Sequence, residues 1–281
     1  MVNRKKFIKG FAAAGVAAMI GPSFLISGDR MKLKNIGFIS GILEKEMKED
    51  WKGALKKAAS FGYTELETGG FMGSSPGEFL KFCKDIGLIP VAGFINFTGK
   101  DDEIKKNIDL IHELEMKFAV TYWPWLTGGP FSLDDCKRSS ERLNYLGDIC
   151  TRNRLTFCWH NHNKEFIKME TGLPFDYLMK NTDPKNVRCE LDIYWVKKGG
   201  DDPLEKLKKY RGRYSILHIK DMAPGPEQDF ACPGSGVIDF RPILSEAEDQ
   251  KIGHYMVERD NVTDGLECLR TSSEYLRSIR F

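Results

Sequence analysis

The chain has 281 residues, of which 41% are hydrophobic, so it is long enough to bury one large core. Its 42 Lys and Arg residues nearly cancel its 40 Asp and Glu residues, leaving a formal net charge of +2. A chain this close to neutral creates no long-range field for a polyanion, and no basic stripe alternates with stacking aromatic residues. We therefore predict that nucleic acid is not its partner.

The first 29 residues differ from the rest of the chain. A basic stretch at 3–9 precedes a small-residue apolar run at 10–26, which Gly21-Pro22 interrupts. This pattern is typical of an export signal rather than a membrane span. We predict an export signal at 1–29 and a periplasmic mature protein without a stable membrane span; an amphipathic first helix is the alternative. The signal resembles the twin-arginine type, but Lys5 stands at the second arginine position, so general secretion is the competing route.

From Lys34 onward, short apolar runs alternate with longer amphipathic stretches, which is typical of βα units around a parallel sheet. We predict eight strands, which close a single-domain (β/α)8 TIM barrel at 30–281. The expected strands are Ile36–Ser40, Tyr63–Glu67, Ile89–Phe94, Phe118–Tyr122, Leu155–His160, Val187–Asp192, Ile216–Lys220 and Tyr255–Glu258. The expected helices include Trp51–Phe61, Pro76–Ile86, Asp102–Leu114, Asp134–Arg152, Pro203–Tyr210, Phe240–Gln250 and Asp264–Ile279. A doubly wound open sheet would want a Gly-rich phosphate loop after its first strand, and residues 39–42 are not one.

Three other features are predicted to be structural. The seven cysteines include no C-x-x-C pair, and an odd number cannot all pair internally, so we expect mostly buried small side chains rather than disulfides or reactive thiols. His112 falls within a helix and His254 at the start of a strand. The basic stretch 206–213 is expected to be a solvated helix face.

Four consecutive strands are expected to end in residues that bind metals. His160, Asp192 and Glu258 close strands five, six and eight, and His218 lies near the end of strand seven. Because the carboxyl ends of barrel strands meet at one face, we expect these side chains to hold one divalent ion. Two imidazoles and two carboxylates suit Mn²⁺, Co²⁺, Mg²⁺ or Zn²⁺, and mixed nitrogen and oxygen ligation discriminates poorly among them.

The motifs around these residues resemble the sugar phosphate isomerase/epimerase family, the xylose-isomerase-like TIM barrels of the AP endonuclease 2 superfamily. The motifs are His218-Ile-Lys-Asp-Met222, Gly234-Ser-Gly-Val-Ile-Asp-Phe240, Val257-Glu-Arg-Asp260, and Leu191-Asp-Ile-Tyr-Trp195 followed by Gly199-Gly-Asp-Asp-Pro203. The resemblance covers the mature chain and implies a metal held by Glu, Asp, His and Glu from strands five to eight. Asp192, His218 and Glu258 match this set. Strand five departs from it, because His160-Asn161-His162 stands where Glu-Asn-His is common.

This departure bears on the reaction. The resemblance implies that two glutamates move the substrate proton, so isomerisation or epimerisation of a sugar or keto-sugar is the leading hypothesis. A single base with a metal also suits β-elimination, as in relatives that look like lyases cleaving 3-keto-glycosides. The candidate catalytic residues are Glu258, His160, His162 and Lys220. His162 is also the alternative to His160 as the metal ligand.

Further residues at the same end of the barrel are candidate contacts for a carbohydrate substrate. They are Glu67, Trp123, Trp125, Glu165 and Trp195. Aromatic rings at a barrel mouth suit the apolar face of a sugar. The alternative is that they only cover the end of the barrel and bind no ligand. Glu165 could instead cap the next element, and Glu67 could have a structural role.

The charged residues bear on the kind of substrate and on competing functions. Lys220 could simply pair with Asp221. No basic cluster suggests a phosphate, so a free sugar or glycoside is favoured over a sugar phosphate. Less favoured functions are a non-catalytic sugar-binding barrel and an abasic-site endonuclease, which needs three metals and more histidines. A homo-oligomer is compatible with the sequence.

Overall fold

A closed barrel of parallel strands forms the centre of the protein. The computed structural model describes residues 32–128 and 130–281, so the export signal expected at 1–29 lies outside the described residues. The strand order around the barrel is β1-β10-β7-β6-β5-β4-β3-β2, and every neighbouring pair is parallel. The barrel strands are β1 (Gly37–Ile39), β2 (Glu65–Thr68), β3 (Ile89–Phe94), β4 (Phe118–Thr121), β5 (Thr156–His160), β6 (Val187–Asp192), β7 (Tyr214–Ile219) and β10 (His254–Val257). The prediction of a TIM barrel is confirmed.

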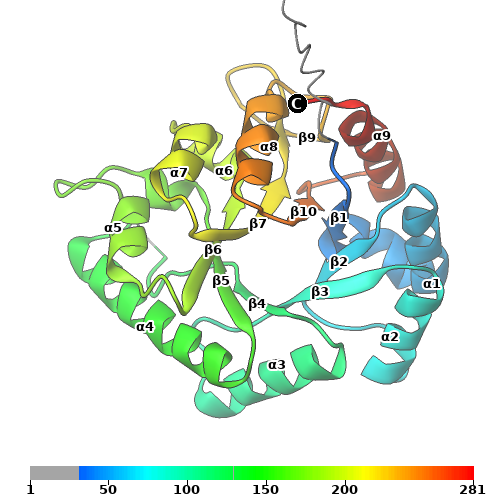
Figure 1. The fold of residues 1–281 in the computed structure, drawn as a ribbon, viewed down its shortest axis with the longest axis horizontal. Coiled ribbons are helices and arrows are strands. Elements are labelled where there is room, and N and C mark those ends of the chain that lie inside the picture. The colour runs from blue at the N-terminus through cyan, green and yellow to red at the C-terminus, as the bar shows by residue number, and fades with distance from the viewer. Residues whose placement is uncertain (1–31, 129) are drawn as a thin grey trace, which may run out of the picture. The chain divides into compact units, whose positions relative to one another are not determined.

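Helices surround the strands (Figure 1). They are α1 (Glu44–Ser60), α2 (Pro76–Asp85), α3 (Asp101–Glu113), α4 (Leu133–Arg152), α5 (Pro174–Asn181), α6 (Ile193–Lys198), α7 (Pro203–Lys209), α8 (Phe240–Asp249) and α9 (Gly265–Ser278). Ser132 accepts a hydrogen bond from the Asp135 amide at the start of α4, and Asp202 caps α7 ahead of Pro203, as these side chains suit helix starts. Helix α1 begins at Glu44 rather than Trp51, and non-helical backbone at Asp50 kinks it.

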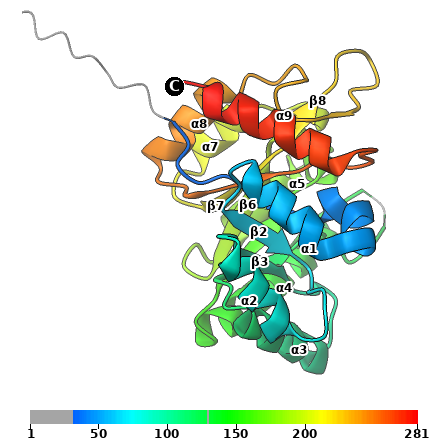
Figure 2. The same ribbon diagram turned by 90° about the vertical axis from the view of Figure 1, so that its right-hand side faces the viewer.

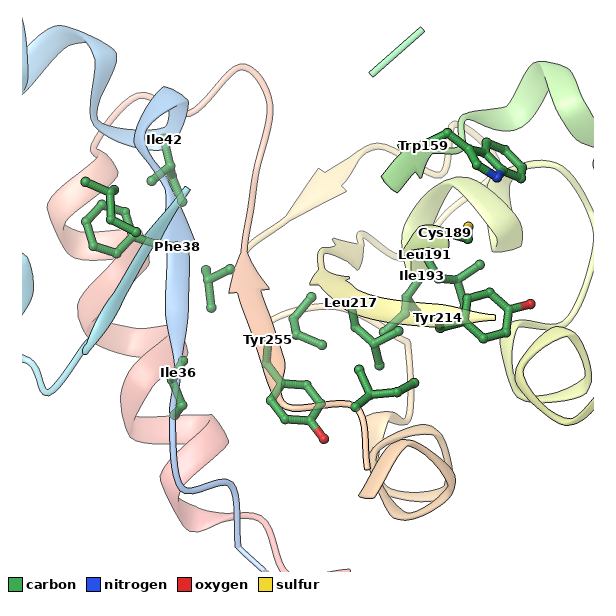
Figure 3. Packing of buried hydrophobic residues seen from close by; sticks show 14 of the residues in the cluster. Ile36, Phe38, Ile42, Trp159, Cys189, Leu191, Ile193, Tyr214, Leu217 and Tyr255 are labelled. Atoms are coloured by element: carbon green, nitrogen blue, oxygen red, sulfur yellow. The ribbon is translucent and has the colours of Figure 1, made fainter. Parts of the chain in front are cut away.

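Successive side chains of each barrel strand point alternately into the barrel and toward the helices, so the protein has two hydrophobic cores. The smaller core fills the barrel with Val91, Ala92, Phe118, Val120, Cys158, Ile216 and Met256. The larger one lies between strands and helices, and Figure 3 shows part of it around Phe38, Leu191 and Tyr255. Because every second residue of a strand shares a face, the inward positions after Ile216 and Met256 belong to His218 and Glu258. The apolar interior therefore gives way to polar side chains at the carboxyl ends of the strands.

A short antiparallel arm follows the seventh barrel strand, and no sequence pattern predicted it. It consists of β8 (Asp221–Met222) and β9 (Phe230–Ala231). A disulfide between Cys232 and Cys268 ties the arm to α9, and Figure 2 shows the arm near that helix. The expectation of buried, unpaired cysteines is thus wrong for these two residues, because the fold brings together positions 36 residues apart. The other five cysteines are free and buried as expected.

The basic stretch at 206–213 is not entirely a solvated face. Lys206 is only 5% exposed, and its Nζ atom lies 2.7 Å from Oδ2 of Asp201 and 3.4 Å from Oδ1 of Asp176. That prediction is wrong at Lys206, because α7 turns this side chain toward α5. His112 is exposed on α3, and His254 Nδ1 lies 3.0 Å from Oε2 of Glu65. Among the described residues, no helix combines the length and apolarity needed to cross a bilayer.

Candidate active site

The structure brings His160, Asp192, His218 and Glu258 together at the barrel mouth. One ligand atom from each lies within 4.8 Å of the others. Nε2 of His160 is 3.7 Å from Oδ2 of Asp192, and Nδ1 of His218 is 2.7 Å from Oε2 of Glu258. Strand register explains the arrangement: Asp192 pairs directly with His218 across β6 and β7, and Glu258 comes directly after β10, which pairs with β7. The four residues therefore share one space although they lie far apart in the sequence.

Asp192 is held so that one of its oxygens faces this space. Its Oδ1 atom accepts the Trp195 backbone N–H at 2.8 Å, which caps α6. The Asn161 side chain binds the Asp192 backbone, accepting its N–H at 3.0 Å and donating to its carbonyl at 3.3 Å. The Oδ2 atom is buried and has no hydrogen-bond partner among the described residues. A buried carboxylate oxygen without a partner is costly, and a cation would satisfy it.

The donor set therefore fits a divalent cation. His160, Asp192, His218 and Glu258 would supply two nitrogens and two oxygens, a combination suited to Mn²⁺, Co²⁺, Mg²⁺ or Zn²⁺. His162 is not part of this cluster, so the geometry favours His160 as the ligand from β5.

The pKa values of the two carboxyl groups in the cluster are shifted in opposite directions. Burial is the main cause that raises the pKa of Asp192 to about 8, with Lys220 acting against it. Burial would also raise the pKa of Glu258, but the charges of Lys220 and His218 outweigh it and hold that pKa well below its usual range. Glu258 is therefore an ionised carboxylate at neutral pH, able to accept a proton.

Lys220 is a buried cation beside this carboxylate. Its Nζ atom lies 2.5 Å from Oδ2 of Asp260 and 3.5 Å from Oε1 of Glu258. It also lies 4.8 Å from the Trp195 ring centre and 4.9 Å from that of Phe230, so aromatic faces replace the missing water. Pairing with Asp221 is not observed, because the Asp221 carboxylate instead accepts backbone N–H groups of Met222, Gly234, Gly236 and Ile238.

Aromatic rings gather around His162 on one side of the mouth. The ring of Trp123 stacks on it at 6.1 Å between centres, and those of Trp125 and Trp195 lie 5.2 Å away. Burial lowers the pKa of His162 to about 3, so it is neutral, and its Nδ1 atom has no partner among the described residues. Trp123 is 51% exposed, so its ring is accessible to a ligand.

The two remaining predicted contacts are both fully buried. Glu165 accepts the His162 backbone N–H at 3.1 Å, so it caps the short 3₁₀ helix at 163–166. It also accepts the Trp125 Nε1–H at 3.0 Å and thereby holds that ring in place beside His162. Glu67 lies below the mouth, where its Oε2 atom is 3.2 Å from Nε2 of His218. The capping role thus fits Glu165.

Sequence reasoning missed two residues that contact the cluster. Glu190 is fully buried, and its Oε2 atom lies 2.9 Å from Nδ1 of His160 and 3.2 Å from Nε2 of His218. The ring centre of Tyr122 lies 5.7 Å from that of His160, and its hydroxyl donates to Oε1 of Glu67 at 2.5 Å. A signal for Glu190 existed: it lies two residues before Asp192 on the same strand face, and an unpaired charge rarely occupies a buried strand.

A cavity of about 590 Å³ opens beside Glu258. Its lining comes from the ends of β1 and β10 and the start of α1, and it carries both charge signs. The lining residues include Glu44, Lys45, Lys48, Arg259 and Asp260. A cavity of this size and polarity suits a polar small molecule.

Comparison with known proteins places the fold in a family. The family model described as "xylose isomerase-like TIM barrel" matches residues 55–279. An inosose dehydratase of Clostridium perfringens is 27% identical over 164 residues, covering 51% of this chain and 54% of that protein. The chain thus spans about half the length of the curated relatives it matches.

Two solved structures share the architecture. A sugar phosphate isomerase/epimerase of Parabacteroides distasonis ATCC 8503 is 27% identical, with a TM-score of 0.75, covering 88% of this chain and 95% of that one. The IolI protein with a bound zinc atom is 19% identical, with a TM-score of 0.70, covering 88% and 99%, and at this identity it shows the fold alone. The family match over most of the barrel, together with the closed parallel sheet, shows that this chain belongs to the xylose isomerase-like TIM barrel family.

Proposed function

We propose that the protein is an enzyme that removes a proton from the carbon next to the carbonyl of a sugar or keto-sugar. The observation that carries this proposal is the ionised Glu258 beside the cation Lys220, facing a cavity and three further ligand-type side chains. Glu258 is the proposed base, and Lys220 keeps it ionised. An acid or base placed in this way contributes about 10²–10⁴-fold to a rate.

A divalent cation is part of this proposal. His160, Asp192, His218 and Glu258 are the residues that would hold it. Such an ion would polarise the substrate carbonyl and stabilise the negative charge that develops on its oxygen. The rings of Trp123 and Trp195 would contact the apolar face of the sugar.

Proton removal has two outcomes, and β-elimination is the one we favour. Glu258 takes the proton and the bond between the next carbon and its oxygen substituent breaks. The proton then passes from Glu258 to the leaving oxygen, so that water or an alcohol is released. Moving a proton between the two faces of a carbon needs a second base. Strand β5 does not end in a glutamate that could serve as this base, but in His160, which belongs to the proposed metal-binding cluster. The similarity to inosose dehydratases, whose name denotes loss of water, supports the same outcome.

Isomerisation or epimerisation is the second candidate. The Parabacteroides distasonis structure, whose name is sugar phosphate isomerase/epimerase, favours it at 27% identity over most of both chains. Both candidates start with the same proton removal, so one experiment tests the common step and then separates them.

The experiment uses metal-loaded protein, keto-inositols and 3-keto-glucosides in deuterated water. NMR follows loss of the signal from the hydrogen next to the carbonyl, and mass spectrometry detects loss of water or of the aglycone. We expect exchange with release of a leaving group, and expect Glu258→Gln to abolish both. Glu65→Gln, a buried carboxyl at the opposite end of β2 from the mouth, is the matched control and should stay active. An isomer without a leaving group would support the second candidate, and no exchange with any substrate would exclude both.

We also propose that the protein is exported to the periplasm. The basic and apolar stretches at 1–29 and the disulfide between Cys232 and Cys268 support this, because disulfides persist in oxidising compartments. Fractionation of cells that express the full chain tests it. Recovery of the protein only in the cytoplasm, with both cysteines reduced, would contradict the proposal.

A further inference from the structure

A second space, which we call the apolar pocket, lies at the mouth of the barrel beside the polar cavity at Glu258. It has a volume of about 230 Å³ and is formed by the ends of β1 and β2, the loop after β2, and helices α1 and α2. Figure 1 shows these elements together on one side of the barrel. The apolar walls of the pocket are Met47, Phe71, Met72 and Phe79.

The apolar pocket adjoins the polar cavity. Gly41, Glu44 and Lys48 line both spaces, so the two have a wall in common. Glu44 and Lys48 pair at 2.5 Å on the exposed surface of α1, and this wall is therefore solvated. A ligand whose polar part lies beside Glu258 can thus extend an apolar part into the pocket.

The loop after β2 forms the pocket before any ligand binds. The Thr68 hydroxyl donates to the Gly70 carbonyl at 2.9 Å, and its oxygen accepts the Gly70 backbone N–H at 3.3 Å. At the other end of the loop, the Glu78 carboxylate accepts both the backbone N–H and the hydroxyl of Ser74. Between these anchors Phe71 remains 38% exposed. An apolar surface that is already in place loses little conformational freedom when a ligand covers it.

The size and chemistry of the pocket suit one aromatic ring. An apolar cavity of about 150 Å³ is enough to bind benzene, so this pocket has room for a phenyl group. Its apolar walls offer water few hydrogen bonds, so replacing that water by an apolar group is favourable. Free keto-sugars and keto-inositols carry hydroxyl groups and no such substituent. A glycoside of a ring-bearing alcohol carries one.

We propose that the apolar pocket binds the leaving group of the substrate, which is therefore a keto-glycoside with an aromatic aglycone rather than a free keto-sugar. The inference rests on the proposed function, because it takes elimination at Glu258 as the reaction. An apolar subsite next to the proposed base has no use when the leaving group is water. It has one when an apolar alcohol must be held until the bond to it breaks.

The reaction of a 3-keto-glycoside balances without a further reactant. Glu258 takes the proton from carbon 2, and the electrons of that C–H bond form a double bond to carbon 1. The bond from carbon 1 to the aglycone oxygen breaks, and its electron pair stays on that oxygen. The proton then passes from Glu258 to the oxygen, so the aglycone leaves as an alcohol and nothing is oxidised or reduced overall.

The first test measures binding without turnover. Benzyl glucoside and methyl glucoside carry no ketone, so neither can undergo the elimination. In full-length protein with ¹³C-labelled methionine methyl groups, NMR should show ring-current shifts at Met47 and Met72 with benzyl glucoside and none with methyl glucoside. Met179, which is buried on α5, is the internal control and should shift with neither. Unshifted Met47 and Met72 at the highest soluble concentration of benzyl glucoside would overturn the inference.

The second test measures turnover of the 3-keto derivatives of the same two glucosides by metal-loaded protein. Benzyl and methyl alcohol are leaving groups of similar basicity, so a difference in kcat/KM reports binding of the ring. Phe71→Ala should lower kcat/KM for the benzyl substrate about 10-fold and leave that for the methyl substrate unchanged. Phe71→Leu keeps an apolar side chain and should restore most of the loss.

Ile167→Ala is the matched control. Ile167 is also an exposed apolar side chain in a loop after a barrel strand, but the pocket it lines has no residue in common with the cavity beside Glu258. This variant should change neither kcat/KM value. Equal kcat/KM for the two substrates, or equal losses for both in Phe71→Ala, would overturn the inference and leave proton removal by Glu258 standing. If neither substrate reacts, the proposed function falls, and the methionine shifts still decide whether the pocket binds the ring.

Discussion

The Nζ atom of Lys220 lies 2.5 Å from Oδ2 of Asp260. Lys220 directly follows β7, and Asp260 lies three residues after the end of β10, the strand next to β7 in the barrel. Lys220 is fully buried, whereas the Asp260 side chain is 43% exposed. The pair thus holds a cation under the mouth, within 3.5 Å of Glu258, while its counterion stays in contact with water.

Replacing Lys220 by Met should reduce kcat/KM by on the order of 100-fold, because Glu258 loses the charge that keeps it ionised. On the acid side of the pH profile, the pH at which kcat/KM falls to half of its maximum should be higher in this variant than in the wild type. Asp260→Asn, which removes only the exposed partner, should have a smaller effect. Steady-state kinetics between pH 5 and pH 9 check this; a Lys220→Met variant with wild-type kinetics would show that the cation is structural.

Removing the metal should lower the unfolding temperature of the wild type. Metal binding only to the folded state adds about 2.7 kcal/mol at a free concentration of 100 times Kd. Calorimetry before and after chelation, and after return of Mn²⁺, Co²⁺, Mg²⁺ or Zn²⁺, measures the effect and ranks the ions. Asp192→Asn should abolish the difference, because it weakens a ligand whose buried oxygen has no other partner among the described residues. Equal unfolding temperatures in all states would contradict a metal at this site.

Replacing both Cys232 and Cys268 by Ala should destabilise the protein by about 3–4 kcal/mol, because the disulfide closes a long loop and limits the unfolded chain. Denaturant unfolding measures the loss. A reducing agent should destabilise the wild type but not the double variant. Cys150→Ala, which removes a free buried cysteine, is the control that should not alter the response to reductant. A wild type indifferent to reductant would indicate that the bond does not form.

Asp176 should stabilise the fold in a pH-dependent way. Burial would raise its pKa, but hydrogen bonds from Lys209 and Tyr210 outweigh it and lower the pKa below the ordinary value of 3.8. A carboxyl whose pKa is lower in the folded state contributes fully above its unfolded pKa and loses that contribution as the pH falls through the folded value. The difference in Tm between the wild type and Asp176→Asn should therefore be constant from pH 8 to pH 5 and shrink below about pH 4. A difference that grows on acidification would contradict the assignment.

Trp123→Ala should raise KM about 10-fold with little change in Tm, because the ring is half exposed and stacked on His162 at the mouth. Trp123→Phe keeps an aromatic face and should restore most of the affinity. Kinetics with the substrate identified by the exchange experiment check both variants. Equal KM values in all three proteins would place the sugar elsewhere.

Local patterns accounted for the barrel and for the residues at its strand ends. Short apolar runs at βα spacing predicted the eight strands, and His160, Asp192, His218 and Glu258 stood out because each ends such a run. The position of Glu190 on the same strand face as Asp192 was a signal, but its contacts with His160 and His218 involve the neighbouring strands β5 and β7 and do not follow from its own strand. The arm formed by β8 and β9 was missed for a similar reason, since strands of two residues leave no periodic pattern.

By itself, the sequence determined the order of strands and helices and which polar side chains lie at the carboxyl end, because hydrophobic periodicity is a property of consecutive residues. Only the tertiary structure decided which side chains touch. The partner of Lys220 is Asp260 rather than Asp221, Cys232 pairs with Cys268, and Lys206 is buried. Each of these depends on how separate elements pack in space, and spacing along the chain does not encode that distance.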